Sequence, residues 1–209
     1  DLHKEYRRQR QMCIRDSVKG VHYLMRKNKI TEVNGHGTFC DAHTMEVTTA
    51  EGTVTISFDT CIIATGSHVA QLPNVEMGGP VVSYEEQILN PQLPHSIVIV
   101  GAIGMEFAYV LANYGVQVTI VEYQDRVLPN EDKDVSTEIA KQYRKLGITL
   151  RTGYKTTAVE RTGSDPDSGV AVTIAPVTAA DVEPETIYAE RCLISTGFRP
   201  NVCLLYTSD

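Results

Sequence analysis

The sequence SIVIVGAIGMEFAYVLANYGVQVTIVE, residues 96–122, decides the fold of this chain. Its apolar run at residues 97–100 is typical of a strand that is buried on both faces, as in a parallel sheet. A glycine turn and a helical pattern over residues 105–114 follow, and a second apolar run at residues 116–121 leads to Glu122. Two such runs joined by about a dozen helical residues predict a βαβ unit with a right-handed crossover.

A unit of this kind can bind the diphosphate of a dinucleotide at its glycine turn. Glycines let the backbone approach the diphosphate closely, and the amino end of the helix offers unpaired N–H groups and partial positive charge. An acidic residue about 20 positions further on can accept hydrogen bonds from a ribose 2′-hydroxyl, and Glu122 has that spacing. Because a carboxylate repels a 2′-phosphate, the sequence favours NAD over NADP. The alternative is a βαβ unit that binds no ligand, but the ordered strand, turn, helix, strand and acid favour a dinucleotide site.

The glycine turn is shorter by two residues than the dinucleotide-binding fingerprint. The fingerprint is G-x-G-x-x-G, whereas residues 101–104 of this chain are G-A-I-G. If Gly101 is the middle glycine, Ile99 or Val100 lies near the sharp first turn, where a Cβ is poorly tolerated. A slide of the strand by two residues would supply the loop and keep the side chains on the same faces. We therefore expect that the fold persists and that the phosphate-binding turn is damaged.

Composition and charge exclude several classes of protein. The chain has 209 residues, of which 42% are hydrophobic, which is enough for one sizeable core or for one domain with part of another. The sequence has no apolar run of membrane-spanning length and no signal peptide, so we expect no membrane association. The net charge of −7 argues against nucleic acid as the main partner. Five cysteines without close pairing predict a reduced, cytoplasmic protein with no metal site: Cys13, Cys40, Cys61, Cys192 and Cys203.

The two ends of the sequence differ from the rest. Residues 1–17 have no clear helix or strand pattern, and QMCIRDS at residues 11–17 resembles translated sequencing-adapter read-through. VCLLYTSD at residues 202–209 resembles the same artefact. We interpret both segments as non-native and exclude them from fold prediction. The alternatives are that they are genuine termini, and that the basic first residues form a binding arm.

Patterning elsewhere predicts a helix over residues 18–29, packed on a sheet, and a helix over residues 132–147. Ser83 and Glu86 form a capping box that starts a short helix. The strands that we expect outside residues 96–122 fall into an N-terminal group, a third parallel strand, an antiparallel meander and a last apolar strand: 30–33, 37–40, 45–48, 53–58, 60–64, 148–150, 154–161, 170–175, 186–189 and 191–196.

Seven motifs, in order and with suitable spacing, resemble the FAD-dependent pyridine nucleotide-disulfide oxidoreductases. The similarity runs from about Val18 to Val202 and covers less than half of a full family chain. Within the family it is greatest to the branch that oxidises protein-bound dihydrolipoamide. The motifs are VNGHG (33–37), IIATGS (62–67), YEEQIL (84–89), IGMEFAYVL (103–111), VTIVE (118–122), LPNED (128–132) and STGFRPN (195–201).

The resemblance implies an α/β fold with two cofactors. A Rossmann-like NAD-binding domain, with a parallel sheet and an antiparallel β-meander, would span residues 83–197, and a partial FAD-binding domain residues 18–82. Residues 198–209 would return to the FAD domain. FAD would contact Gly37, Thr65, Gly66 and Ser67. Residues of the NAD site would be Gly101, Ala102, Ile103, Gly104, Met105, Glu106 and Glu122, with Gly197 near the cofactors.

The resemblance also implies an activity and a partner. Electrons would pass from dihydrolipoamide on the lipoyl domain of a 2-oxoacid dehydrogenase complex, through a redox disulfide and FAD, to NAD in a homodimer. The family's first glycine-rich FAD loop, its redox cysteine pair and its C-terminal His-Glu pair have no counterpart here. We therefore assign no catalytic residue, interpret the chain as an inactive central fragment, and interpret Cys40, Cys61 and Cys192 as small core residues. The alternatives are a sister NADH oxidase or disulfide reductase, and a non-catalytic NAD-binding module.

Overall fold

The computed structural model describes residues 16–165, 168–179 and 182–202 of the chain. These residues form two compact units, 16–64 and 65–202, which are described separately below. The predicted non-native leader, except for its last two residues, the tail from residue 203 onward, Cys13 and Cys203 lie outside the described residues. Among the described residues, no helix combines the length and the apolar character that crossing a bilayer requires.

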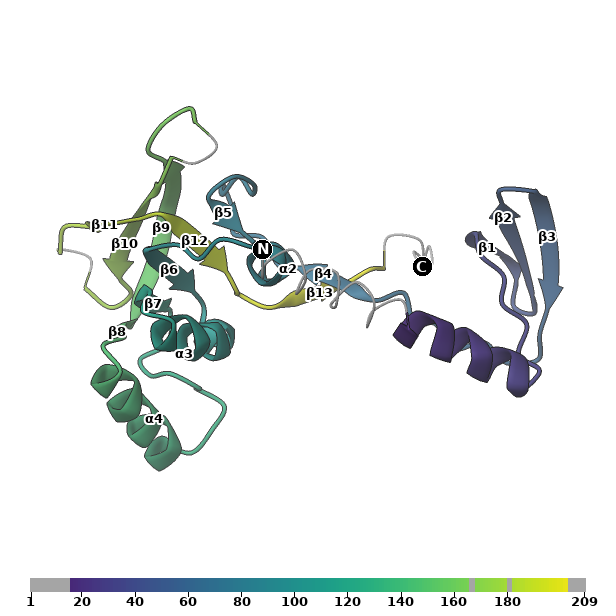
Figure 1. The fold of residues 1–209 in the computed structure, drawn as a ribbon, viewed down its shortest axis with the longest axis horizontal. Coiled ribbons are helices and arrows are strands. Elements are labelled where there is room, and N and C mark those ends of the chain that lie inside the picture. The colour runs from purple at the N-terminus through teal and green to yellow at the C-terminus, as the bar shows by residue number, and fades with distance from the viewer. Residues whose placement is uncertain (1–15, 166–167, 180–181, 203–209) are drawn as a thin grey trace. The chain divides into compact units, whose positions relative to one another are not determined.

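The first unit contains a helix over residues 16–27 and an antiparallel sheet (Figure 1). The sheet has the order β1-β2-β3, with β1 at His36–Asp41, β2 at Thr44–Thr49 and β3 at Gly52–Ser57. These strands confirm the predictions for residues 37–40, 45–48 and 53–58. Polar turns join them, so each strand pairs with its neighbour in the sequence.

Three predictions for the first unit were wrong. The helix does not bury its apolar side chains against a sheet, because Val18, Val21 and Leu24 are 50–51% exposed. Residues 30–33 and 60–64 are not strands. A strand needs a partner for its backbone hydrogen bonds, and neither segment pairs with a strand among the described residues. Ile62, in the second of these segments, is 89% exposed.

A parallel sheet of five strands organises the second unit, in the order β5-β12-β6-β7-β8. The βαβ prediction is confirmed, since β6 and β7 pair in parallel and a helix connects them. Of the strands in this sheet, the short β5 was not predicted. The elements of this layer are β5 (Val81–Val82), α2 (Tyr84–Leu89), β6 (Ser96–Val100), the 3₁₀ turn η1 (Ala102–Gly104), α3 (Met105–Asn113), β7 (Gln117–Glu122), α4 (Lys133–Lys145), β8 (Thr149–Thr152) and β12 (Arg191–Ile194).

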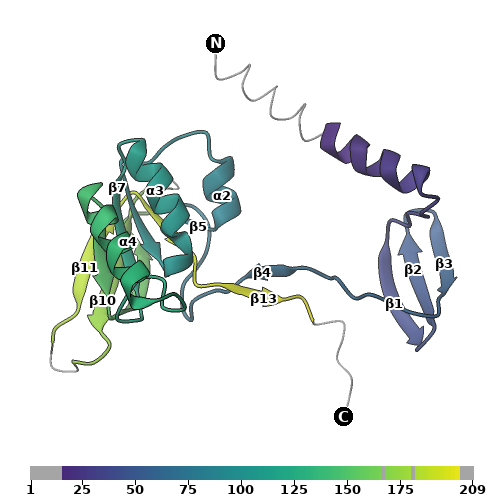
Figure 2. The same cartoon turned by 90° about the horizontal axis from the view of Figure 1, so that it is seen from below.

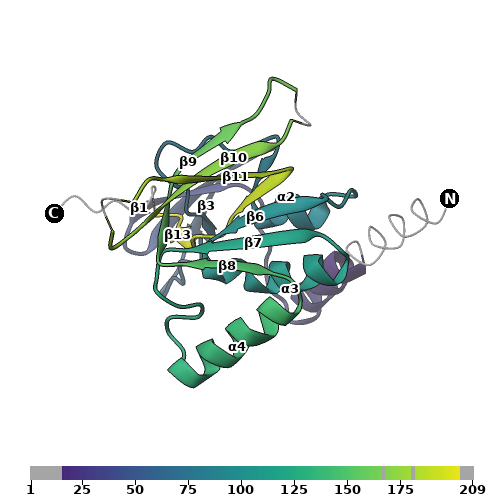
Figure 3. The ribbon, with the colours of Figure 1, turned by 90° about the vertical axis from the view of Figure 1, so that its left-hand side faces the viewer.

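The predicted meander is also confirmed. It consists of β9 (Tyr154–Arg161), β10 (Val170–Pro176) and β11 (Glu185–Ala189) in the order β11-β10-β9. Figure 3 shows this meander on one side of the parallel sheet and helices α3 and α4 on the other. The unit therefore has three layers, with the parallel strands in the middle.

Alternating side chains of β6 join the layers. Ile97 and Ile99 belong to the core cluster that includes residues of α3, and Val98 and Val100 to the cluster that includes residues of β9 and β10. All four are at most 5% exposed. The sequence predicted this double burial from the uninterrupted apolar run.

The capping box of α2 forms as predicted. The Ser83 N–H donates to Glu86 Oε2 at 2.7 Å, and the Glu86 N–H donates to Ser83 Oγ at 3.4 Å. These bonds satisfy two donors that a helix start would otherwise leave free. The helix is thereby fixed directly after β5.

A short antiparallel ribbon joins two distant motifs of the second unit. Strand β4 (Ser67–Val69) pairs with β13 (Phe198–Pro200), as Figure 2 shows. Asn201 extends the pairing, because its N–H donates to the carbonyl oxygen of Gly66 at 2.9 Å. The predicted FAD-contacting residues 65–67 therefore lie beside the end of the last motif.

Candidate functional site

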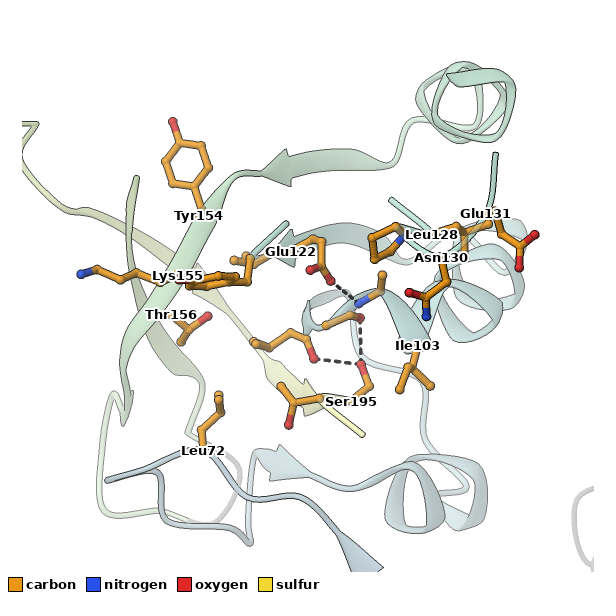
Figure 4. Close-up of a pocket in the computed structure, with 17 residues that line it drawn as sticks. Leu72, Ile103, Glu122, Leu128, Asn130, Glu131, Tyr154, Lys155, Thr156 and Ser195 are labelled. Carbon is orange, nitrogen blue, oxygen red and sulfur yellow. Dashed lines mark hydrogen bonds between the residues drawn. The ribbon is translucent and has the colours of Figure 1, made fainter. Parts of the chain in front are cut away.

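A cavity of about 560 Å³ opens at the carboxyl end of the parallel strands (Figure 4). The glycine turn and the end of β7 form one wall, and β9 residues 154–156 line another. Residues 128–131 also contribute, as do Ser195 and Thr196, which follow β12. In the sheet, β6 lies between β12 and β7, so the direction of the chain connections reverses there. Ligands of open α/β sheets bind at such a switch point.

Glu122 is a charged side chain in direct contact with the glycine turn. Its Oε2 accepts a hydrogen bond from the Ala102 N–H at 2.7 Å, and its Oε1 accepts one from the Gln124 N–H at 2.8 Å. The residue is 7% exposed and lines the cavity. Glu122 follows Ala102 by 20 positions and lies directly against the turn, as the spacing of the fingerprint predicts.

Close packing against β12 requires both glycines of the turn. Gly101 has φ of +100°, and a Cβ there would lie 2.4 Å from the carbonyl oxygen of Ser195. A Cβ on Gly104 would lie 2.2 Å from Ile99 Cγ2 and 2.6 Å from Ser195 Oγ. Contacts this short force backbone or core atoms to move. The short turn therefore fits tightly between β6 and β12.

Ser195 contacts the turn from the side opposite Glu122 (Figure 4). Its hydroxyl donates to the carbonyl oxygens of Val100 at 2.9 Å and Gly101 at 3.0 Å. Its own N–H donates to the Val100 carbonyl oxygen at 2.8 Å. Sequence reasoning missed this role, although the residue opens the STGFRPN motif.

Helix α3 begins directly after the turn and is tied to α4. The Tyr143 hydroxyl donates to the Met105 carbonyl oxygen at 3.0 Å. Burial raises the pKa of Tyr143, and the nearby Glu106 and Tyr109 raise it further. The phenol therefore stays protonated and keeps its role as donor at neutral pH. This bond fixes the amino end of α3, which carries the partial positive charge of the helix.

Part of the residue set predicted for the NAD site lines the cavity. Gly101, Ala102, Ile103 and Glu122 all line the cavity. The other predicted residues of this set lie around the turn but do not line the cavity: Gly104 is buried behind it, Met105 is in the core, Glu106 is exposed on α3, and Gly197 follows cavity residues 195 and 196.

The predicted FAD set is divided between the two units. Thr65, Gly66 and Ser67 lie at the β4–β13 ribbon, whereas Gly37 lies on β1 in the first unit. The Thr65 hydroxyl donates to the Asn201 carbonyl oxygen at 2.6 Å, and the Asn201 amide donates to the Thr65 carbonyl oxygen at 3.1 Å. The turn that contains Gly66, with φ of +75°, is thus held by a residue 135 positions later.

The cysteine prediction is right for one residue and wrong for two. Cys192 is fully buried in β12, and burial raises its pKa to about 12. Cys40 and Cys61 are exposed. Cys40 lies on a strand whose residues, apart from Gly37, are all exposed, and Cys61 lies in the segment that does not form a strand, so neither has a core to enter.

The cavity fits a pyridine dinucleotide in its chemistry. Its volume is within the range of about 300–1,000 Å³ that is typical of small-molecule sites. The Glu122 carboxylate at the end of β7, beside the glycine turn, matches the group that binds a ribose in such sites. Thr156 Oγ1, which is buried and lacks a hydrogen-bond partner among the described residues, offers a further polar contact in the wall.

Comparison with known proteins gives a family match over nearly the whole chain. The family model described as pyridine nucleotide-disulphide oxidoreductase matches residues 3–209. The dihydrolipoyl dehydrogenase of Corynebacterium glutamicum is 54% identical over 188 residues. That alignment covers 88% of this chain and 39% of the relative, so the chain spans well under half of that relative's length.

Solved structures show the same fold. LpdA from Mycobacterium tuberculosis matches with a TM-score of 0.78 and 25% identity, over 92% of this chain and 42% of that one. The HOCl-induced flavoprotein disulfide reductase RclA from Escherichia coli, as its Cu(II) complex, matches with a TM-score of 0.71 and 25% identity, over 92% and 44%. The predicted fold class is confirmed.

Proposed function

The chain belongs to the pyridine nucleotide-disulphide oxidoreductase family, and we propose that its glycine turn and Glu122 form the NAD site of a dihydrolipoyl dehydrogenase. The predicted cofactors, FAD and NAD, are those that this family uses. The observation that carries the proposal is the hydrogen bond between the Ala102 N–H and the Glu122 carboxylate, in the wall of a cavity at the switch point of the sheet.

Glu122 keeps enough acceptor capacity for a ribose. An ionised carboxylate has about four lone-pair sites, and the N–H groups of Ala102 and Gln124 use two of them. The other two can accept the 2′- and 3′-hydroxyls of the adenosine ribose. A 2′-phosphate would bring its negative charge against this carboxylate, so NAD is the expected cofactor.

The other predicted residues have supporting roles in the proposal. Gly101, Ala102 and Ile103 bring backbone close to the diphosphate, while Gly104, Met105 and Glu106 begin the helix whose amino end faces that anion. Gly197 lies between β12 and β13, directly after cavity residues 195 and 196. NAD supplies hydride acceptance when bound, and these residues supply orientation and charge complementarity.

Part of an FAD site accompanies the NAD site in this proposal. We propose that Thr65, Gly66, Ser67 and Gly37 contact FAD, and that residues 18–82 and 83–197 belong to the FAD and NAD domains. The hydrogen bonds between Thr65 and Asn201 support the first set, since they hold the Gly66 turn in one conformation.

The whole enzyme, on this proposal, oxidises protein-bound dihydrolipoamide through a redox disulfide and FAD, and reduces NAD. Its partner would be the lipoyl domain of a 2-oxoacid dehydrogenase complex, and it would act as a cytoplasmic homodimer. The 54% identity to a dihydrolipoyl dehydrogenase supports this over a sister disulfide reductase, for which RclA is only 25% identical. The chain alone is expected to be inactive.

Isothermal titration of the 209-residue chain with NADH and NADPH tests the nucleotide site. We expect NADH to bind weakly, with a Kd on the order of 0.1–1 mM, because the turn lacks two residues of the fingerprint. NADPH should bind at least about tenfold more weakly than NADH. Tight, stoichiometric NADH binding would contradict the damaged turn, and equal binding of both nucleotides would contradict the role of Glu122.

A restored turn gives a sharper test of the same site. Insertion of Gly-Ala between Val100 and Gly101 produces G-A-G-A-I-G, which fits the fingerprint. We expect NADH to bind at least about tenfold more tightly to this variant. The matched control inserts Gly-Ala after Gly163, in the connection between β9 and β10, and should leave the affinity unchanged. If neither variant nor the parent chain binds NADH, the proposed function is wrong.

A further inference from the structure

The loop between β7 and α4, residues 123–132, forms the cavity wall that faces β9. Residues 128–131 of this loop line the cavity, and Figure 4 shows them and the β9 residues on opposite sides of Glu122. The loop is also joined to Glu122 directly, because the Gln124 N–H donates to Glu122 Oε1 at 2.8 Å. A ligand group that binds the Glu122 carboxylate therefore lies close to this loop.

Arg126 ties the cavity-lining part of the loop to its first half. The Nη2 of Arg126 donates to the carbonyl oxygen of Pro129 at 2.7 Å and to that of Glu131 at 3.3 Å. The guanidinium thus binds the backbone of two of the four residues in the stretch 128–131. The next residue, Val127, is 1% exposed in the core and anchors the backbone of the arginine. Arg126 is therefore fixed at its backbone and holds the cavity wall with its side chain.

The same stretch contains a backbone conformation that needs support. Leu128 has φ of +49°, which residues other than glycine rarely adopt and which persists only where the surroundings hold it. Its carbonyl oxygen accepts from the Glu131 N–H at 3.0 Å and from Ser136 Oγ at 3.1 Å. Ser136 is 2% exposed, so a buried hydroxyl of α4 also supports the loop. Strained backbone of this kind is concentrated at ligand sites, and here it lies in a cavity wall.

We propose that Arg126 is a positioning residue for the adenosine half of NAD, which acts by holding residues 128–131 in place beside Glu122. This inference rests on the proposed NAD site, in which Glu122 binds the adenosine ribose, and adds a residue to that site. The wall suits a nucleoside, because Leu128 offers apolar surface and Asn130 offers an amide to a flat base with a polar edge. Arg126 does not itself line the cavity, so it acts through the loop.

The test compares Arg126→Ala and Arg126→Lys with Arg144→Ala in the 209-residue chain. Lysine keeps the charge of Arg126 but lacks its fork of donors. Arg144 is a matched control, because it is an exposed arginine in the last turn of α4, does not line the cavity, and changes the net charge equally when removed. NMR titrations with AMP and NADH give the affinities. NMR relaxation of the nucleotide-free chain measures the mobility of the Asn130 and Glu131 amides.

Arg126→Ala should weaken AMP and NADH by the same factor of about fivefold, as expected if the loop has its binding shape about a fifth of the time. The factors should be equal because AMP contains the whole adenosine half. The amides of Asn130 and Glu131 should become more mobile, while those of residues 101–104 should not change. Arg126→Lys should cause a loss of about twofold, and Arg144→Ala none. If Arg126→Ala fails to fold, Arg126→Lys should show the same pattern at this smaller size.

Three results would overturn the inference. More mobile amides with unchanged AMP affinity would show that the loop does not border the nucleotide, and unchanged mobility would show that Arg126 does not hold the loop. An equal loss of affinity in Arg144→Ala would show that only the charge matters. All three results leave the proposed NAD site intact, because the parent chain still binds. If neither AMP nor NADH shifts the signals of cavity residues in the parent chain, the proposed function fails and this inference fails with it.

Discussion

The two units of the chain use similar sequence patterns and reach different degrees of burial. Among the described residues, every buried apolar side chain except Val47 belongs to residues 65–202. In residues 16–64, the helix has apolar residues at helical spacing, yet Val18, Val21 and Leu24 are about half exposed. An amphipathic pattern therefore determines which face can be buried, and burial itself depends on a complementary surface.

The parallel sheet supplies such a surface on both of its faces. Strand β6 contributes Ile97 and Ile99 to one core cluster and Val98 and Val100 to the other. The three strands of the first unit have one buried apolar residue, and small sheets with little core are marginally stable. We therefore expect most of the chain's stability to reside in residues 65–202.

The largest expected difference between the units is in thiol reactivity. Cys192 has a pKa raised to about 12 by burial, so at pH 8 about one thiol in ten thousand is ionised. Cys40 and Cys61 are exposed. Iodoacetamide should modify Cys192 at least about a thousandfold more slowly than the two exposed residues, as followed by peptide mass spectrometry. Unfolding in guanidinium should equalise the rates, and fast modification of Cys192 in the native chain would contradict its burial.

The second largest expected difference between the units is the loss of unfolding free energy when an isoleucine is truncated. Ile99 is fully buried, and Ile99→Ala removes three carbon atoms from the core of the second unit. The cost should be about 3–4 kcal/mol of unfolding free energy. The matched variant Ile62→Ala, at a residue that is 89% exposed, should cost less than about 0.5 kcal/mol. Urea unfolding followed by circular dichroism measures both; similar costs would show that residue 62 is buried in solution.

Glycine-to-alanine substitutions should change the unfolding free energy by smaller amounts, and in opposite directions in the two units. Gly104→Ala places a Cβ against Ile99 and Ser195 and should destabilise the chain by about 1–3 kcal/mol. Gly20 lies in the exposed helix, and a Cβ added there would meet no other atom within 4 Å. Gly20→Ala should therefore stabilise that helix by about 0.5–1 kcal/mol. Thermal unfolding of both variants checks the signs, and a stable Gly104→Ala chain would refute the tight turn.

The sequence predicted those parts of the fold whose partners are close in the chain. The βαβ unit lies within 27 residues, so its strands, turn and helix all appear in one stretch. The capping box of Ser83 and Glu86 is equally local. Strand β5 escaped prediction because it has two residues and pairs with β12, about 110 positions later. The predicted strand at residues 60–64 failed for a related reason, since apolar residues form a strand only where another strand pairs with them.

The candidate site was likewise predicted only where its residues are close in the sequence. Glu122 was predicted from its spacing to the glycine turn, and its carboxylate does reach Ala102. Ser195 was not predicted, because its relation to the turn depends on β12 pairing beside β6. The local pattern explained Gly101 and Gly104 only by the approach of a ligand to the backbone. The structure adds a second requirement, since a Cβ at either residue would collide with Ser195. Long-range strand order is the information that the local patterns lacked.

The smallest expected effect concerns two histidine–carboxylate pairs, one in each unit. In the second unit, Glu190 accepts from the His95 backbone N–H at 2.7 Å and contacts His95 Nδ1 at 2.7 Å. The backbone hydrogen bond from His95 is the main cause that lowers the pKa of Glu190, and the imidazole adds to it. In the first unit, Glu32 contacts His22 Nδ1 at 2.7 Å. Both glutamates are partly exposed, so solvent weakens these pairs.

A lowered pKa in the folded state makes Glu190 stabilising only while it is ionised. Its contribution is therefore present above the ordinary glutamate pKa of 4.5 and is lost as the pH falls through the lower folded value. Glu190→Gln should flatten the acid side of the stability profile of the second unit, measured as Tm between pH 3 and pH 6, by a degree or two at most. Glu32→Gln is the matched change in the first unit. It should leave the pH profile of the second unit unchanged, because that profile reports the stability of residues 65–202. A Glu190→Gln profile as steep as that of the parent chain would mean that the backbone N–H of His95 does not bind the carboxylate in solution, and equal flattening by both variants would mean that the two units unfold together.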